Sequence, residues 1–122
     1  MPVRAPIQIE DLTEKEWSAQ VVELARALGW SRYHTYRSDR SEPGWPDEAL
    51  VRDRLVLLEL KAERGRLSDA QKEWIRKLLA AGVEVYVARP SDLTELANLL
   101  HARARPDSLL ALRTVSEVEV SP

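Results

Sequence analysis

Two carboxylates and a lysine flank the most apolar stretch of the chain. Asp47 ends a Gly-Trp-Pro-Asp turn, and Glu59 and Lys61 lie at the end of the apolar run that begins at Leu55. Because side chains two positions apart on a strand share a face, Glu59 and Lys61 are predicted to point the same way. A carboxylate and an ammonium at the end of a buried strand are costly unless they pair or bind something. If a neighbouring strand brings Asp47 alongside, two carboxylates converge beside one lysine.

This trio has the chemistry for metal-assisted hydrolysis of a phosphodiester. Mg²⁺ takes one or two carboxylates, keeps several waters and accepts phosphate oxygens of a substrate. The metal lowers the pKa of a bound water, and Lys61 orients or deprotonates that water or offsets charge on the phosphate. The alternative is a small α/β interaction protein in which Glu59 and Lys61 form a structural ion pair and Asp47 lies too far away to share a cation. Glu-x-Lys is common, so local spacing alone favours that alternative.

The elements that would position these residues follow from hydrophobic periodicity and from capping patterns. A helix is predicted to begin at Thr13, whose capping-box partner is Glu16, and to end at Gly29. A second helix is predicted to begin at Ser68, with Gln71 three residues later. The remaining predicted elements are strands over residues 32–37, 49–52, 55–61 and 83–87, and a third helix capped by Ser91.

The predicted order is therefore α-β-β-β-α-β-α, and a buried strand among helices implies a sheet covered on both faces, in three layers. The sequence divides into an irregular lead-in over residues 1–12, one domain over 13–104 and a C-terminal tail over 105–122. A short strand, a partner-binding extension and disorder all remain open for the tail.

This combination resembles the PD-(D/E)xK nuclease superfamily, with Pro46-Asp47 before the apolar strand and Glu59-x-Lys61 at its end. More closely, the chain is similar to stand-alone VRR-NUC domains of the phage and bacterial kind. The matching segments are Thr13-Glu-Lys-Glu-Trp17, Gly29-Trp30, Tyr33-His34-Thr35, Arg40-Ser41-x-x-Gly44-x-Pro46-Asp47, Glu59-Leu60-Lys61, Gly65-x-Leu67-Ser68-x-x-Gln71 and Val85-Tyr86-Val87.

The resemblance implies a restriction-endonuclease-like α/β/α core and a metal-dependent DNA endonuclease that acts on branched or otherwise structured DNA and leaves 5′-phosphates. It implies that Asp47, Glu59 and the backbone carbonyl of Leu60 hold Mg²⁺, for which Mn²⁺ substitutes. It also implies that Lys61 acts on the attacking water as the catalytic lysine. It also places Gln71 at the site, although the capping box alone accounts for that residue.

The resemblance further implies an acidic residue on the first helix, and two candidates are available. Glu16 has a capping role, which favours Glu14 as the residue available to the site. Glu16, however, also shares a helix face with Gln20 and Glu23. The choice between Glu14 and Glu16 stays open.

Nucleic-acid contacts are expected on the strand and loop that lead into Asp47. Arg37, Arg40 and Ser41 are candidates for contacts to backbone phosphates, with a solvated loop as the alternative. Trp45 is the tryptophan placed to touch a nucleic acid, although it could instead pack against its own turn. The other tryptophans, Trp17, Trp30 and Trp74, are predicted to pack in the core, and His34 is predicted to be a packing residue.

Composition excludes several other classes of site. The 122 residues include 18 Lys plus Arg against 20 Asp plus Glu, no cysteine and two histidines. Disulfides, thiolate metal sites, cysteine nucleophiles and histidine-rich metal sites are therefore excluded. The net charge of −2 argues against nucleic-acid binding through bulk positive charge.

A cytoplasmic location is expected, because the sequence contains neither a signal-peptide pattern nor a membrane span. The expected partners are DNA and, given the small size of the domain, a second copy in a homodimer. The alternative function is a nuclease-fold module that binds nucleic acid or a protein without cutting.

Overall fold

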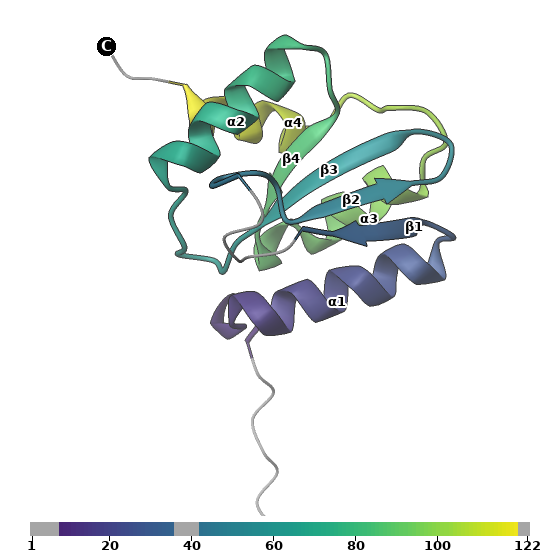
Figure 1. Cartoon of the computed structure of the whole chain (residues 1–122). Coiled ribbons are helices and arrows are strands. Elements are labelled where there is room, and N and C mark those ends of the chain that lie inside the picture. Colours follow the sequence, from purple (N-terminus) through teal and green to yellow (C-terminus); the bar gives the residue numbers. More distant parts are fainter. Residues whose placement is uncertain (1–7, 36–41, 120–122) are drawn as a thin grey trace, which may run out of the picture.

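A four-stranded mixed sheet forms the middle of the molecule (Figure 1). The computed structural model describes residues 8–35 and 42–119. The strands lie in the order β1-β2-β3-β4, in which β1, β2 and β3 are antiparallel and β4 runs parallel to β3. Their bounds are β1 (Ser31–His34), β2 (Glu48–Val51), β3 (Leu55–Leu60) and β4 (Val85–Ala88).

Helices cover both faces of this sheet (Figure 1). The helical elements are η1 (Ile9–Asp11), α1 (Glu14–Ala27), α2 (Asp69–Ala80), η2 (Pro90–Asp92), α3 (Leu93–His101) and α4 (Leu109–Val118). The predicted order of the main elements is confirmed, with α4 as an addition. None of the helices within the described ranges combines the length and the apolar character needed to cross a membrane.

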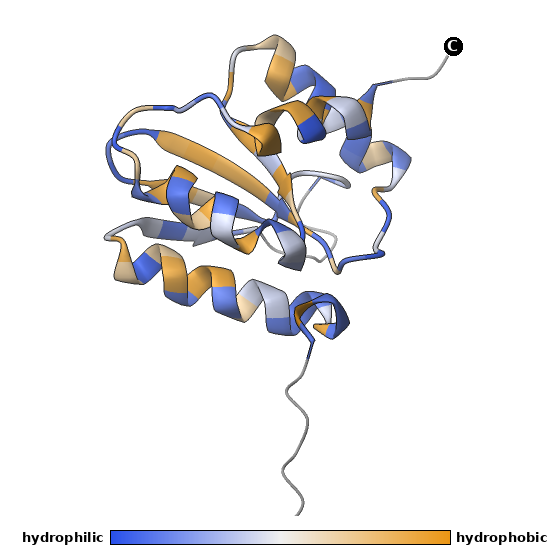
Figure 2. Cartoon of the chain, turned by 180° about the vertical axis from the view of Figure 1, so that it is seen from behind, coloured by the Kyte–Doolittle hydropathy of each residue, from blue (hydrophilic) through white to orange (hydrophobic). Residues whose placement is uncertain are grey.

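Alternation along β3 divides the core in two. Val56, Leu58 and Leu60 pack with the buried faces of α1 and α3, whereas Leu57 packs with α2 and α4 on the other side. Figure 2 shows β3 as an almost continuous apolar ribbon, as expected for a strand buried on both faces. The three-layer α/β/α architecture expected of a restriction-endonuclease-like core is confirmed.

Both predicted capping boxes are present. The Glu16 amide donates to Thr13 Oγ1 at 3.1 Å, and the Thr13 amide donates to Glu16 Oε1 at 3.0 Å. Ser68 and Gln71 make the same pair of bonds at the start of α2. Each box satisfies two amides that have no acceptor within the helix, so the starts of α1 and α2 are set by local sequence.

The predicted cap of the third helix is wrong. Ser91 lies inside the short η2 turn, and its amide and hydroxyl both donate to Glu63, at 2.9 and 2.8 Å. The residue that precedes α3 is Asp92. The reason is that Pro90 and Ser91 form a separate 3₁₀ turn before the α-helix begins.

The tail contains an α-helix after Pro106. The sequence had left a short strand, a partner-binding extension and disorder open for this segment, and had not predicted a helix. Ser108 caps α4 by accepting the Ala111 amide at 3.0 Å. In the described part of the sheet β4 is an edge strand, and the Thr114 hydroxyl of α4 accepts the Val87 amide at 3.0 Å. Leu110 and Val118 are buried in the two core clusters. The helix thus covers a strand edge whose amide would otherwise lack a partner.

The turn that carries Asp47 lies directly against the start of α2. Gly44 has a φ of +90°, and a Cβ atom there would lie 2.4 Å from both the carbonyl carbon and the carbonyl oxygen of Ala70. A residue with a side chain would meet both the strain of positive φ and a clash with backbone. Gly44 therefore lets the Asp47 turn approach α2 closely.

Gly44→Ala is expected to lower the free energy of unfolding by clearly more than Gly82→Ala. Gly82 has a φ of +81° but open space around its Cβ position, so its substitution costs only the conformational strain, about 1–2 kcal/mol. Urea unfolding followed by tryptophan fluorescence measures both variants. Equal losses of stability would contradict the close packing described for Gly44.

Candidate active site

Asp47 is held at the end of β3 by backbone groups from two other segments. Its side-chain Oδ2 accepts the Leu60 amide at 3.0 Å, and its carbonyl oxygen accepts the Thr35 amide at 2.9 Å. The Thr35 hydroxyl donates to the carbonyl of Pro46 at 2.8 Å. These bonds fix the carboxylate beside the strand that carries Glu59, which is the condition that the sequence left open.

Glu59 is buried, with 1% of its surface exposed, on the sheet face that α2 covers. Its Oε2 accepts a hydrogen bond from Gln71 Nε2 at 3.3 Å. Its Oε1 is buried and has no hydrogen-bond partner among the described residues. Buried carboxylate oxygens are rarely left unpaired, so this carboxyl must hold either a proton or a cation.

The two carboxyl groups are close enough to perturb each other. Burial raises the pKa of Glu59 to about 9, assisted by a hydrogen bond and by charge repulsion from Asp47 and only partly opposed by the Lys61 ammonium. A carboxyl in this state is protonated at neutral pH unless a cation takes the place of the proton.

Lys61 follows β3 directly, and its amide donates to the Ala88 carbonyl at 3.1 Å. Its ammonium nitrogen lies 3.8 Å from Glu14 Oε1, and its side chain is 14% exposed. Lys61 therefore forms its ion pair with Glu14 of α1. The alternative of an interaction protein required an ion pair with Glu59 instead. Asp47 also lies beside Glu59, whereas that alternative placed it out of reach.

The first-helix acid at the site is Glu14. Glu16 is engaged in the capping box and is exposed, so it lies away from Lys61. Glu14 and Glu16 differ by two positions on α1, about 200° around the helix axis, so docking of the helix brings only one of them to the site.

Gln71 combines two roles that the sequence left as alternatives. Its Oε1 accepts the Ser68 amide at 2.8 Å, which completes the capping box, and its Nε2 donates to Glu59. An amide has both an acceptor and donors, so one side chain serves both purposes.

The residues at this position fit a hard divalent cation. Asp47 and Glu59 place two carboxyl groups close to each other. Glu59 Oε1 has no hydrogen-bond donor from any other residue in the described ranges. Within those ranges no group of three or more His, Cys, Asp or Glu side chains is arranged to hold a metal. Two carboxylates, a carbonyl such as that of Leu60 and water form the ligand set that Mg²⁺ accepts.

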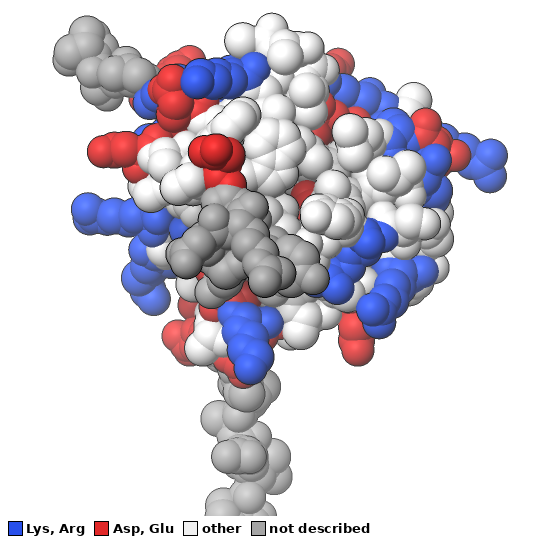
Figure 3. Space-filling model, viewed as in Figure 1, with Lys and Arg blue, Asp and Glu red and all other residues white. Residues whose placement is uncertain are grey.

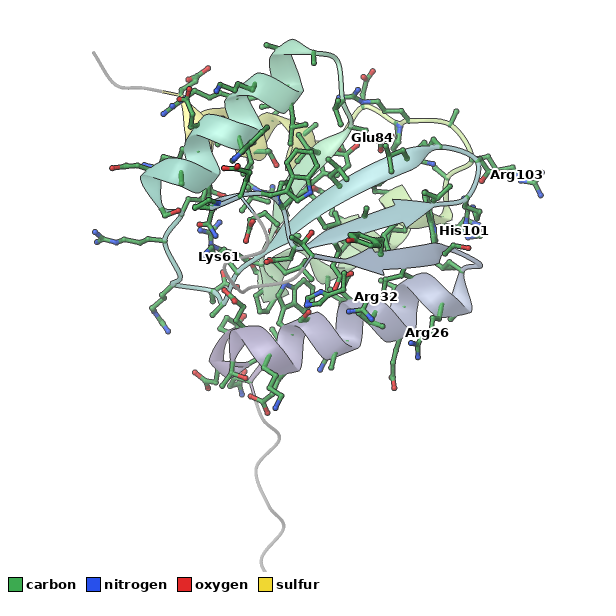
Figure 4. All side chains as sticks on the ribbon, viewed as in Figure 1. Arg26, Arg32, Lys61, Glu84, His101 and Arg103 are labelled. Carbon is green, nitrogen blue, oxygen red and sulfur yellow. The ribbon has the colours of Figure 1, made fainter. Side chains whose placement is uncertain are left out.

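A groove of about 560 Å³ runs from this position between α1 and the sheet. We call it the α1–β1 groove, and it is lined by Glu14, Lys15, Ser18, Ala19, Val22, Glu23, Arg26, Arg32, His34, Asp47 and Leu60. Figure 3 shows Lys and Arg side chains gathered at the lower right, where α1 and β1 adjoin in Figure 1. Figure 4 shows Arg26 and Arg32 there, with Lys61 toward the opposite end of α1.

Sequence reasoning missed Arg32 and Glu48, and it assigned His34 only to packing. His34 is exposed, which contradicts its predicted packing role, and it contacts buried Glu48 together with Arg32. Arg32 and His34 are two apart on a strand and so share a face, but their carboxylate partner becomes visible only with the β1–β2 register. Arg37, Arg40 and Ser41 lie outside the described residues.

Two of the three tryptophans predicted to pack in the core are buried there, and the third is not. Trp17 and Trp30 are buried and donate from Nε1 to the carbonyls of Ala88 and Leu100, at 3.0 and 2.9 Å. Trp74 was predicted in the core but is only partly buried, and it packs edge-on against Trp45 with ring centroids 5.0 Å apart. Trp45 therefore packs against α2, and the two rings also line a shallow surface pocket.

The pH dependence of stability tests the raised pKa of Glu59. In metal-free buffer the folded wild type holds a proton that the unfolded chain releases above the ordinary value of 4.5. The free energy of unfolding is therefore expected to fall between pH 5 and pH 9, relative to Glu59→Gln, by up to about 1.4 kcal/mol per pH unit. Urea unfolding across this range measures the difference. Glu23→Gln, an exposed control, should track the wild type, and a constant gap between wild type and Glu59→Gln would contradict the raised pKa.

Comparison with known proteins agrees with this geometry. The family model of the VRR-NUC domain matches residues 5–92, which include Asp47, Glu59, Lys61 and Gln71. No curated protein and no solved structure gives a match. Since the matched region covers most of the chain, the protein belongs to the VRR-NUC domain family, a branch of the PD-(D/E)xK nuclease superfamily, and is a nuclease-type module with a nucleic-acid partner.

Proposed function

We propose that this VRR-NUC domain is a Mg²⁺-dependent DNA endonuclease that hydrolyses phosphodiester bonds. The observation that carries the proposal is the pairing of Asp47 with buried Glu59, whose Oε1 has no other partner among the described residues. A carboxyl pair of this kind is unfavourable without a cation and becomes favourable with one.

In this proposal Asp47, Glu59 and the Leu60 carbonyl hold the metal. Bound Mg²⁺ would polarise the phosphate and lower the pKa of a water molecule. Lys61 orients that water or offsets charge on the phosphate, and Glu14 restrains the lysine from α1 at 3.8 Å.

Gln71 restrains the other side of the site by donating to Glu59 Oε2. The donor fixes one oxygen of the carboxylate, which leaves Oε1 for the metal. Because Gln71 is also part of the α2 capping box, its amide is already positioned before any ligand binds.

A binding module without catalysis is the alternative function. Asp47, Glu59 and Lys61 are all present, and the ammonium of Lys61 is near enough to Glu59 to influence its pKa. That complete set favours hydrolysis. Action on branched or structured DNA and assembly as a homodimer stay predictions, and the mass of the protein in solution tests the latter.

Cleavage of labelled linear, flapped and four-way-junction DNA in Mg²⁺ or Mn²⁺ tests the proposal. Wild type is expected to cut at least one of these substrates. Lys61→Ala and Asp47→Asn are each expected to lower the rate by about 100-fold or more, because each removes a group that acts on the metal-bound water or holds the metal.

Matched controls are available at exposed positions far from the site. Lys77→Ala and Asp53→Asn make the same chemical changes on α2 and in the β2–β3 turn, and both should retain the wild-type rate. The catalytic assignment is wrong if the wild type cuts none of these substrates. It is also wrong if Lys61→Ala and Asp47→Asn cut as fast as their controls.

The dual role of Gln71 gives a second test. Ser68→Ala and Gln71→Ala each remove one side chain of the α2 capping box and should lower stability similarly, by about 1 kcal/mol. Only Gln71→Ala also removes the donor to Glu59, so it alone is expected to slow cleavage, by about tenfold. Thermal unfolding and cleavage kinetics on the same samples separate the effects. Equal cleavage rates for the two variants would show that Gln71 acts only in the capping box and not at the site.

A further inference from the structure

Glu48 is a second buried carboxylate beside the candidate active site, and the hydrolysis proposed above does not use it. It is 1% exposed, follows Asp47 directly in sequence and faces α1. Arg32 donates to it from Nε and Nη2, both at 2.8 Å, and His34 Nδ1 lies 2.9 Å from Oε1. One buried carboxylate thus holds two basic side chains of β1, and the bidentate arginine already offsets its charge.

The arrangement directs His34 into the α1–β1 groove. Its side chain is 45% exposed and lines the groove together with Asp47. The contact to Glu48 occupies Nδ1, and Nε2 takes no part in it. In the imidazolium form both ring nitrogens are donors, so Nε2 can donate to an anion while Nδ1 donates to Glu48.

The groove is long enough for a polyanion. Glu14 lies at the Lys61 end, and Arg26 lies roughly 18 Å farther along the α1 axis, at about 1.5 Å per residue. A strand of B-form DNA carries one phosphate about every 3.4 Å along its axis, so the groove can follow several consecutive phosphates. Arg26 and Arg32 both line the groove, and Figure 4 shows them farther along α1 from Lys61.

We propose that the α1–β1 groove binds the sugar-phosphate backbone of the substrate strand on one side of the cleaved bond. His34 and Arg26 contact its phosphates, and Glu48 and Arg32 hold His34 in place. The inference rests on the proposed nuclease function and specifies where that function meets its substrate.

The charges favour this ligand over a base or a peptide. The groove opens at Asp47, where the scissile phosphate would meet the metal, and carries Lys15, Arg26, Arg32 and His34 along its walls. Its acidic members are Asp47, Glu14 and Glu23. Asp47 belongs to the candidate metal site and Glu14 to the Lys61 ion pair, so among these three only Glu23 opposes a phosphate along the groove wall. Donors of this kind recognise phosphate without reading sequence.

Two histidine variants separate positioning from contact. His34→Asn places an amide nitrogen where Nδ1 lies, so it can keep the bond to Glu48 but has nothing at the Nε2 position. His34→Gln reaches the Nε2 position instead. Arg26→Gln removes a surface charge on the groove, and Arg103→Gln removes a matched exposed arginine that lies away from it.

Binding of fluorescein-labelled duplex DNA by the full chain is measured by anisotropy at several NaCl concentrations. Ca²⁺ replaces Mg²⁺ as the oxygen-ligated cation. His34→Asn and Arg26→Gln are each expected to weaken binding by about three- to tenfold, and His34→Gln by less. Arg26→Gln should also lower the salt dependence of log K by about one phosphate contact, or about 0.9. Arg103→Gln should match wild type, and thermal unfolding should be unchanged for Arg26→Gln.

The outcomes separate the groove from the nuclease function. If wild type cuts DNA but Arg26→Gln and His34→Asn bind it as wild type does, the groove assignment is wrong and the nuclease function stands. The same holds if Arg103→Gln weakens binding as much as Arg26→Gln, because the effect would then be one of overall charge. If wild type neither binds nor cuts DNA, both proposals fail.

Discussion

Asp47 and Glu59 bring two carboxyl groups together at the end of β3, where desolvation and mutual repulsion oppose the ionised forms. The result is a raised pKa for Glu59 and a buried oxygen without a partner among the described residues. A fold selected for stability alone would replace such a pair with apolar side chains. The surrounding contacts are therefore best understood as the means of holding this pair in place.

Those contacts come from every layer of the domain. The sheet supplies the Leu60 amide to Asp47, and α2 supplies Gln71 to Glu59. From the other face, α1 supplies Glu14 to Lys61. Gly44 allows the Asp47 turn to approach α2 at a distance that no other residue tolerates without strain. The site is thus built on regular elements, which restrict its geometry more than loops would.

The β1–β2 hairpin extends this organisation along α1. Directly opposite residues of an antiparallel pair share a face, so the register puts His34 beside Glu48 and Arg32 beside Leu50. Glu48 is buried on that face, whereas its neighbour Asp47 turns to the end of β3. Two adjacent carboxylates therefore have different environments because one belongs to the strand and the other precedes it. A shift of one residue in register would exchange those environments.

Local physics accounts for what the sequence determined by itself. Thr13 with Glu16 and Ser68 with Gln71 mark the helix starts, because a capping box is completed within four residues. The apolar run that ends at Glu59 defines the central strand, since a strand covered on both faces must be apolar throughout.

Long-range packing decided the rest. Glu14 faces Lys61 because of the rotation at which α1 docks, which a single helix does not encode. Burial of Glu48 and the only partial burial of Trp74 depend on which parts of each sheet face the helices cover. Helix α4 was not foreseen, because its buried residues gain their apolar environment from α2, α3 and β4, which lie elsewhere in the chain. The residue types of the site were thus determined locally, and their convergence was determined by the tertiary structure, because the distances between them are set by strand register and helix docking.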